Sequence, residues 1–279
     1  MIHINQLQKS YGKVKAVNGI DLRVEAGELF AFLGPNGAGK TTTIRILTGL
    51  TRIGYGEVRI GGHDIIKAPR EAKRQCGLVP QHINLDSELS VRENLEIHGR
   101  LFGMDSGQRR RKIEELLAYV ELLDRIDTLV KQLSGGLKRR LMIARALMHE
   151  PKVLFLDEPT VGLDPAIRRR IWSLIKRVQQ DGTTIFLTTH YIEEAEFLAA
   201  RVAFLDQGKI VALDSPQALM DSLGKWAVDQ MNGEAMQTQY FASREEAAKF
   251  AASQNCGVSL RRVNLQDAFL SLTGKKVLS

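Results

Sequence analysis

Apolar residues follow two different spacings along this 279-residue chain. Short runs in which nearly every residue, or every second one, is apolar predict β-strands. These runs lie at Ile2–Gln8, Gly19–Val24, Leu29–Leu33, Val153–Leu156, Thr184–Thr188 and Val202–Leu205. Between several of them apolar residues recur three and four positions apart, which predicts helices such as the one at Ile167–Gln180. Strands and helices that alternate in this way are typical of an α/β core with a parallel sheet.

Two segments interrupt the alternation. A pair of glycines inside "GEVRIGGHDI" predicts an edge hairpin at Gly56–Ile65. From about Asp86 to Val130 the pattern is helical, and with the next helix the predicted helical insert covers residues 86–150. The core is therefore expected to carry a helical block in its middle.

The C-terminal part has a different character. A helix is predicted at Ser243–Gln254, a strand at Gly257–Val263, and a last helix that Asn264 caps and Gly274 terminates. This order predicts a small α+β appendix behind the main domain. The two predicted units are residues 1–220 and residues 221–279.

Composition places the chain among ordinary globular proteins, with 44% hydrophobic and 25% charged residues. The N-terminus lacks the apolar segment of a signal peptide, and no run approaches the ~18 apolar residues that span a bilayer. We therefore expect a cytoplasmic protein. Cys76 and Cys256 are too few and too far apart to suggest a disulfide framework or a zinc site, so reduced structural thiols are expected.

The formal net charge of +7 is compatible with nucleic acid, a membrane surface or a phosphate ligand. Basic residues cluster on three expected helices, without aromatic residues between them. The clusters are Arg109–Arg111, Lys138–Arg140 and Arg168–Arg170. This pattern favours solvated helix faces, and no nucleic-acid partner is expected.

A phosphate-binding loop is the clearest chemical motif. "GPNGAGKT", Gly34–Thr41, fits G-x-x-x-x-G-K-[ST], with an apolar strand before it and a helix after it. Its backbone N–H groups are expected to cradle phosphate oxygens, with Lys40 on the β- and γ-phosphates and the Thr41 hydroxyl on Mg²⁺. Asp157 follows an apolar strand and supplies a second magnesium ligand. Glu158 stands one residue further and is positioned to orient or deprotonate an attacking water.

A second anion-binding device precedes another helix. In "LSGG", Ser134 and two glycines head an amphipathic helix, so its N-terminus can bind a phosphate. The apolar residues on one face of that helix are Leu137, Leu141, Ala144 and Leu147. A symmetric dimer can place the "LSGG" of each chain over the nucleotide that the other chain holds.

Seven motifs, in this order, resemble those of the ATP-binding subunits of ABC transporters. They are "SYG" around Tyr11, "GPNGAGKTT" as the Walker A motif, "VPQ" ending at Gln81, "LSGGL", "VLFLDEP" as the Walker B motif, "GLD" ending at Asp164 and "TTH" ending at His190. The resemblance covers about residues 2–220. It implies a P-loop NTPase fold with a RecA-like core, an antiparallel β subdomain and a helical subdomain.

The resemblance also implies roles for individual residues. The expected catalytic residues are Glu158, His190 and Gln81. The expected Mg²⁺ ligands are Thr41, Gln81 and Asp157. Contacts with ATP fall on Tyr11, Val17, Gly34, Pro35, Asn36, Gly37, Ala38, Gly39, Lys40, Thr41, Thr42, Ser134, Gly135, Gly136 and Asp164.

Within the family, the chain most resembles one branch, the type-two exporters of daunorubicin-resistance type. "TTHYIEEAE", "NLQDAFLSLTG" and "LSGG" followed by a hydrophobic residue and "KRR" carry this resemblance. Leu137 stands where many members have glutamine, so the amide on the ribose side is absent while "SGG" is intact. The branch implies a homodimer, or a dimer with a paralogous cassette, on the cytoplasmic face of the membrane. There it would drive a separate transmembrane permease.

Two other classes of function compete with an exporter subunit. A soluble ABC ATPase without a transport role is one, but translation-type members resemble two fused cassettes and only one P-loop occurs here. DNA-repair members carry a coiled coil or zinc modules, for which the sequence shows neither heptads nor cysteine clusters. An ATP-binding regulator without hydrolysis is the other, and the intact Glu158 and His190 argue against it.

Overall fold

The computed structural model describes residues 1–232, 235–254 and 257–274. Its core is a six-stranded sheet in the order β10-β9-β3-β8-β7-β6, in which all neighbours are parallel except β10 and β9. The strands are β3 (Leu29–Leu33), β6 (Cys76–Val79), β7 (Val153–Asp157), β8 (Thr184–Thr189), β9 (Arg201–Asp206) and β10 (Lys209–Asp214). The predicted α/β core with a parallel sheet is thus confirmed, whereas the short β6 and the antiparallel β10 were not predicted.

Both faces of this sheet are covered, which explains its uninterrupted apolar strands. All residues of β3, β7 and β8 are buried. Alternate residues of β3 enter two separate cores: Leu29, Ala31 and Leu33 face one, and Phe30 and Phe32 face the other. The first core is closed by α5 (Gly135–Leu147), α6 (Pro165–Gln180) and α7 (Ile192–Leu198).

An antiparallel sheet and α1 (Lys40–Leu47) close the second core. This sheet has the order β2-β1-β4-β5 and consists of β1 (Ile2–Tyr11), β2 (Val14–Val24), β4 (Tyr55–Ile60) and β5 (His63–Asp64). β4 and β5 pair across Gly61 and Gly62, so the predicted edge hairpin is confirmed. The short helix α2 (Pro69–Arg74) leads from it to β6.

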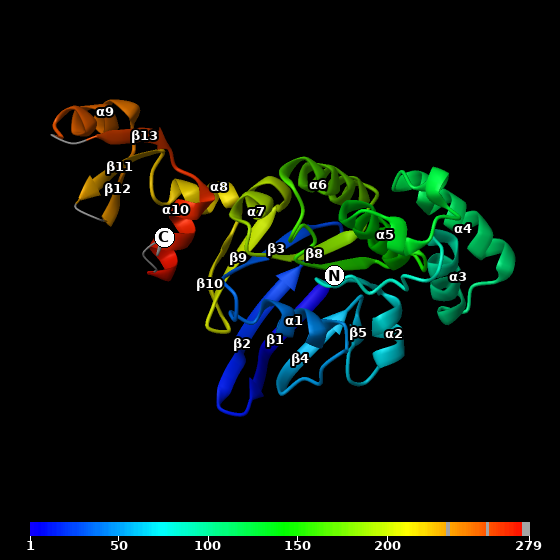
Figure 1. The fold of residues 1–279 in the computed structure, drawn as a ribbon. Coiled ribbons are helices and arrows are strands. Elements are labelled where there is room, and N and C mark those ends of the chain that lie inside the picture. The colour runs from blue at the N-terminus through cyan, green and yellow to red at the C-terminus, as the bar shows by residue number, and fades with distance from the viewer. Residues whose placement is uncertain (233–234, 255–256, 275–279) are drawn as a thin grey trace.

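The predicted helical block is confirmed between β6 and β7. It contains α3 (Val91–Leu101), α4 (Ser106–Tyr119), two short 3₁₀ turns at Leu123–Arg125 and Val130–Gln132, and then α5. Ser90 and Glu93 form a capping box at the start of α3, and Asp105 caps α4. In Figure 1 α3 and α4 lie at one end of the molecule, far from the C-terminal strands.

The C-terminal elements form a three-stranded sheet in the order β12-β11-β13, with α9 packed against it. They are α8 (Pro216–Asp221), β11 (Trp226–Asn232), β12 (Ala235–Phe241), α9 (Arg244–Ala252), β13 (Val258–Arg262) and α10 (Leu265–Thr273). Asn264 caps α10 in a capping box and Gly274 ends it in the left-handed conformation, as predicted.

The hairpin β11–β12 was not predicted from the sequence. The last helix, α10, packs back on the core, where the Phe269 and Phe204 rings lie 5.2 Å apart. The Leu265 N–H donates to the Glu196 carboxylate of α7 at 3.1 Å. The division into residues 1–220 and 221–279 remains a proposal.

One expectation about the basic clusters is wrong. Arg139 and Arg140 are only 4% and 8% exposed, so they are not part of a solvated helix face. Each donates to backbone carbonyls, and Arg140 also pairs with the Glu121 carboxylate. Charged groups can be buried in this way because their hydrogen bonds are satisfied.

Cys76 is a free thiol that donates to the Ala72 carbonyl, and burial raises its pKa to about 12. It is therefore an unreactive thiol at neutral pH, as expected. Cys256 lies outside the described residues. Within the residues that the structure describes, no helix is both long and apolar enough to cross a bilayer.

Candidate functional site

Parallel strands bring the predicted catalytic motifs together. β3, β8 and β7 are neighbours, and the chain leaves each of them at the same edge of the sheet. In register, Leu33 at the end of β3 stands beside Thr189 of β8, and Asp157 at the end of β7 stands beside Thr188. The phosphate loop, the Asp157–Glu158 pair and His190 therefore meet at one sheet edge, where ligands of open α/β folds bind.

The phosphate loop runs against neighbouring backbone so closely that it requires glycine at two positions. A Cβ at Gly34 would lie 2.4 Å from the Leu205 carbonyl oxygen, and one at Gly39 would lie 2.2 Å from that of Ala16. Gly39 also has φ 106°, a conformation that side chains rarely adopt, and it stands directly before α1. These contacts hold the loop over the N-terminus of α1, whose free N–H groups attract anions.

Lys40 is buried inside this loop. Its ammonium donates to the carbonyl oxygens of Gly34 at 2.7 Å and Pro35 at 3.2 Å. It also lies 3.2 Å from a carboxylate oxygen of Glu158, and both side chains are almost fully buried. The ammonium is thus fixed at the centre of the loop, where a phosphate would need its charge.

Glu158 connects Lys40 with His190. Its second carboxylate oxygen accepts a hydrogen bond from His190 Nδ1. Glu158 has φ 50°, an uncommon conformation for a residue with a side chain, and its N–H donates to the Thr188 carbonyl at 2.9 Å. The strained turn directs the Glu158 side chain toward the phosphate loop and away from the strand.

Oxygen atoms gather around Asp157. Its Oδ1 accepts from the Thr188 hydroxyl at 2.6 Å and from the Thr41 hydroxyl at 3.2 Å. A carboxylate and hydroxyls are hard oxygen donors that suit Mg²⁺, which binds through one or two protein groups plus phosphates and water. The residues present therefore fit a magnesium ion beside the phosphate loop. The structure contains no group of three or more acidic, histidine or cysteine side chains that would hold a metal by itself, among the residues it describes.

Gln81 follows β6, the neighbour of β7, so it emerges at the same edge of the sheet. Its side chain is half-buried. Tyr11 ends β1 with 49% of its surface exposed, and the Lys9 ammonium lies 5.4 Å from the centroid of its ring. Val17 differs, because its side chain is 1% exposed in the core and only its backbone can reach a ligand.

Within one chain, the "LSGG" stretch does not contact the phosphate loop through the side chains nearest to its glycines. Ser134 caps α5 by accepting from the Leu137 N–H at 3.4 Å, and Ser134 and Gly135 are exposed. A Cβ at Gly136 would lie 2.6 Å from Ile167 of α6, so this glycine permits close packing of the two helices. A Cβ at Gly135 would lie 3.7 Å from Leu163, the residue before Asp164, so the side chains nearest to the two glycines come from this loop and from α6, and not from the phosphate loop. Asp164 itself caps α6 by accepting from the Ile167 N–H at 2.9 Å.

Two residues of the candidate site, Thr188 and Arg139, were not predicted from the sequence. Thr188 supports both Asp157 and Glu158, and the register of two parallel strands that end in "LD" and "TT" could have indicated it. Arg139 holds the backbone at Gln81, and no local sequence signal distinguishes it from a surface arginine.

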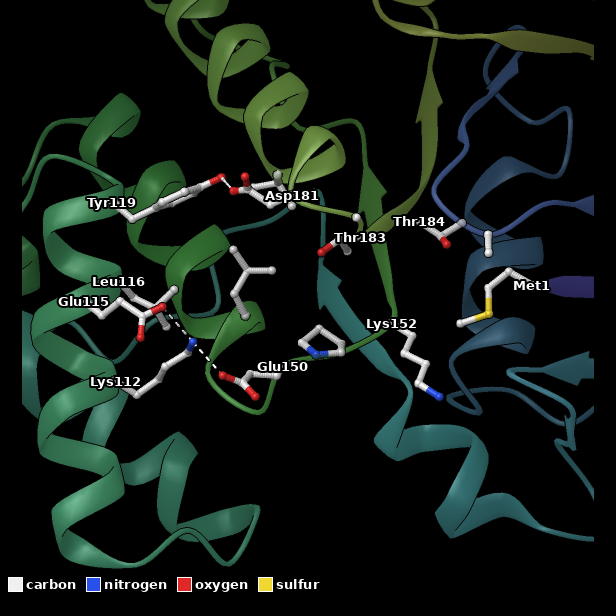
Figure 2. A pocket seen from close by; sticks show the side chains of 15 residues that line it. Met1, Lys112, Glu115, Leu116, Tyr119, Glu150, Lys152, Asp181, Thr183 and Thr184 are labelled. Atoms are coloured by element: carbon white, nitrogen blue, oxygen red, sulfur yellow. Dashed lines mark hydrogen bonds and ion pairs between the residues drawn. The ribbon is translucent and has the colours of Figure 1, made fainter.

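A pocket with a volume of about 620 Å³ lies at the opposite ends of the strands, where Thr184 begins β8. Figure 2 shows the side chains that line it. Lys112 of α4 pairs there with Glu150 at 2.8 Å, and the Tyr119 hydroxyl donates to Asp181 at 2.7 Å. Because the phosphate loop follows the carboxyl ends of the strands, this pocket is not the nucleotide site. Its polar contacts instead tie α4 to the core.

Comparisons with known proteins agree with this geometry. The family model described as ABC transporter matches residues 17–161. The chain is 39% identical to a Nod factor export ATP-binding protein I of Cupriavidus metallidurans, over 99% of this chain and 98% of that protein. It is 38% identical to a daunorubicin resistance ATP-binding protein, DrrA3, of Streptomyces coeruleorubidus, over 98% of this chain and 96% of that protein.

Solved structures show the same architecture. The cassette cbiO1 from Clostridium perfringens superposes with a TM-score of 0.73 at 28% identity, covering 78% of this chain and 89% of that one. A dimeric post-hydrolysis structure of the cassette MJ0796 bound to ADP and Pi has a TM-score of 0.69 at 30% identity, covering 77% of this chain and 98% of that one.

Proposed function

The chain belongs to the ABC transporter family as an ATP-binding and ATP-hydrolysing subunit, and we propose that the edge of the six-stranded sheet is its catalytic site. The contact of Lys40 with Glu158, and of Glu158 with His190, carries this proposal. A cation for phosphate, a candidate base and a histidine converge there, and the side chains of Lys40 and Glu158 are almost fully buried. No packing requirement explains a buried carboxylate at this strained position.

In this proposal the phosphates of ATP displace the Glu158 carboxylate as the ion-pair partner of the Lys40 ammonium. The β- and γ-phosphate oxygens bind the backbone N–H groups of the loop and the start of α1. Glu158, released from Lys40, accepts the proton of the water that attacks the γ-phosphorus, and ADP leaves. His190 holds the Glu158 carboxylate in position through their hydrogen bond.

Mg²⁺ would be held by the Thr41 hydroxyl and the Asp157 carboxylate, with Gln81 beside it. When bound, the ion would neutralise the charge that develops on the phosphate oxygens. Thr188 orients the Asp157 carboxylate for this role by donating to it.

We further propose that the catalytic unit is a dimer. Ser134 and Gly135 are exposed at a helix N-terminus, beside the Asp164 loop of the same chain. An exposed anion-binding helix end is explained if it closes over the ATP of a second copy, or of a paralogous cassette. The dimeric structure of the similar cassette MJ0796 bound to ADP and Pi supports a dimer.

Export through a separate membrane subunit is the proposed biological role. The relatives named for Nod factor export and daunorubicin resistance support it, since each is similar along nearly its whole length. On α3, Ile97 and Leu101 are 47% and 78% exposed, and Ile83 near Gln81 is 48% exposed. Exposed apolar residues on α3 and near Gln81 suit a partner that rests on them at the cytoplasmic face of the membrane.

Purification of the tagged chain from detergent-extracted membranes tests this role against a soluble ABC ATPase. Export predicts that an integral membrane protein of about six spans, each meeting the ~20-residue helix criterion, is recovered in stoichiometric amount. Recovery of the chain in the soluble fraction, alone or with a soluble partner, would favour the alternative.

A further inference from the structure

Arg139 joins the two loops that the sequence assigns to different ATP molecules. Its guanidinium donates to the Pro80 carbonyl at 2.8 Å and to the Gln81 carbonyl at 2.9 Å. The side chain extends from α5, the helix that begins with Gly135 and Gly136. Only 4% of the residue is exposed, so this contact is an internal one.

The position of Arg139 in α5 makes this contact mechanically direct. Gly135 and Arg139 are four residues apart and therefore lie about one turn apart on the same helix. A helix of this length moves as a body, so a displacement of its N-terminus is passed to the guanidinium. The guanidinium binds two consecutive carbonyls with a rigid fork, so the backbone at Gln81 must follow it.

We propose that Arg139 is a positioning residue that makes the two ATP sites of the dimer cooperative. The inference rests on the proposed function, in which Ser134 and Gly135 bind the partner's ATP and Gln81 serves the chain's own. When the partner's γ-phosphate fixes the start of α5, Arg139 sets the backbone of Gln81 at the other site. Each site is thereby completed only when both are loaded, and the coupling is reciprocal.

The surroundings of Arg139 favour this role over simple packing. Its charge lies in the field of Asp157, the proposed magnesium ligand, and of the buried Glu194. Burial lowers the pKa of Arg139, and these two carboxylates act in the opposite direction. A leucine or methionine would fill the same volume without the desolvation cost of a charge, but it would leave two carbonyls unpaired.

Arg140 provides a matched control on the same helix. It is 8% exposed and donates to the Val120 carbonyl and to Glu121, at 3.4 and 2.7 Å. Both partners belong to the helical block and neither belongs to the Gln81 loop. Removal of Arg140 therefore removes another buried guanidinium from α5, whose carboxylate partner Glu121 is exposed, without touching the proposed connection.

The test is ATP hydrolysis as a function of ATP concentration for Arg139→Gln, Arg139→Lys and Arg140→Gln. Wild type and Arg140→Gln should have a Hill coefficient between about 1.5 and 2, because the coefficient is bounded by the number of sites. The Hill coefficient of Arg139→Gln should fall to about 1. Its kcat should fall about ten- to a hundredfold, which is the usual effect of a lost charged hydrogen bond. Its affinity for ATP as a monomer should stay unchanged. Arg139→Lys, which can reach one carbonyl, should be intermediate.

The outcomes separate the inference from the function on which it rests. A cooperative wild type together with an equally cooperative Arg139→Gln variant would overturn the inference alone. A wild type that neither cooperates nor dimerises with ATP would overturn the proposed dimer and the inference with it. If Arg139→Gln does not fold, Arg139→Lys carries the test, and a lysine variant with a wild-type Hill coefficient and kcat would refute the role.

Discussion

Lys40 and Glu158 form an ion pair inside the proposed nucleotide site, with the ammonium 3.2 Å from the carboxylate and 5–6% of each side chain exposed. The lysine belongs to the phosphate loop and the glutamate follows β7, so the pair joins the two motifs that we propose act on ATP. Phosphate oxygens that bind Lys40 compete with Glu158 for the same charge. We therefore expect binding of ATP to be linked to release of the proposed catalytic carboxylate.

Lys40→Ala should abolish ATP binding and also destabilise the fold. It removes the fixed charge for the phosphates and leaves Glu158 buried without its main counter-charge. We expect a loss of about 1–3 kcal/mol, less than for a fully isolated pair, because the contact with His190 remains. Chemical denaturation should show that Glu158→Gln, added to Lys40→Ala, restores part of this loss. Strictly additive effects of the two changes would contradict a direct interaction.

Glu158→Gln should bind ATP with near-normal affinity and hydrolyse it at least about a hundredfold more slowly. The amide keeps the shape of the side chain but cannot accept a proton from water. Size-exclusion chromatography with ATP should then show a stable dimer, because the nucleotide is trapped between the chains. Turnover at the wild-type rate would remove Glu158 from its catalytic role.

Ser134→Ala should bind ATP as a monomer and lose most of its turnover. The exposed hydroxyl makes only a 3.4 Å contact within its own helix, so the cost in stability should be about 0.5–1 kcal/mol. Ser243→Ala is the matched control, since Ser243 caps α9 in the appendix at 3.2 Å. Equal activity of the two variants would mean that Ser134 is a helix cap and nothing more.

Acid should weaken the helical block through His98. Burial, together with Arg145 and His149, lowers the pKa of His98 to about 4. The unfolded chain therefore binds the proton more readily, near pH 6.5, and stability is full above that pH and is lost as the pH falls toward 4. His98→Phe keeps an aromatic ring beside Phe102, which lies 4.9 Å from the imidazole.

Urea titrations of wild type and His98→Phe at pH 7.5 and 4.5 measure this contribution. Since His98 is partly exposed, the wild type should lose about 1–2 kcal/mol more on acidification than the variant. The same loss in both proteins would show that His98 does not cause the acid sensitivity.

Ile97→Ser and Leu101→Ser should weaken binding of the membrane subunit and leave the ATPase activity of the isolated chain unchanged. Both side chains are exposed on α3, so neither supports the core. Val211→Ser is a control, because Val211 is also exposed and lies on β10, at the edge of the sheet opposite to β6. The measurement is co-purification from membranes. Full recovery of the partner with both α3 variants would exclude this surface as the docking site.

The sequence predicts the elements that carry strong local signals. The buried strands β3, β7 and β8 are continuous apolar runs, and the phosphate loop is a motif with a fixed spacing. In contrast, β6 is four residues with a glycine, and β11 and β12 contain mostly polar or small residues, so periodicity does not distinguish them from loops.

Contacts between distant segments are the part that periodicity cannot supply. Lys40 and Glu158 are 118 positions apart and meet only because β3 and β7 flank the same strand. Arg139 and Arg140 on α5 are a case in which the sequence pattern led to a wrong prediction. A run of basic residues on a helix is usually solvated, but here the helix is covered on both sides, and tertiary hydrogen bonds replace water.

Two defective variants can be combined to test the shared site directly. Lys40→Ala removes the phosphate loop function and keeps "LSGG" intact, whereas Gly135→Asp places a negative charge where the partner's phosphate should bind. Each variant alone should be inactive. In a mixed dimer one site receives the intact phosphate loop of one chain and the intact "LSGG" of the other, while the second site receives both defects.

ATP hydrolysis by an equimolar mixture of these two variants is the most direct measurement of the central claim. If the sites are shared, the mixture should be clearly more active than either variant alone. The ceiling is about a quarter of wild-type turnover, because about half of the dimers are mixed and each has one intact site. The coupling proposed for Arg139 lowers the recovered turnover below this ceiling, because the second site of a mixed dimer stays empty. A mixture no more active than its separate components, when both are folded and Gly135→Asp binds ATP, would contradict a catalytic site built from two chains.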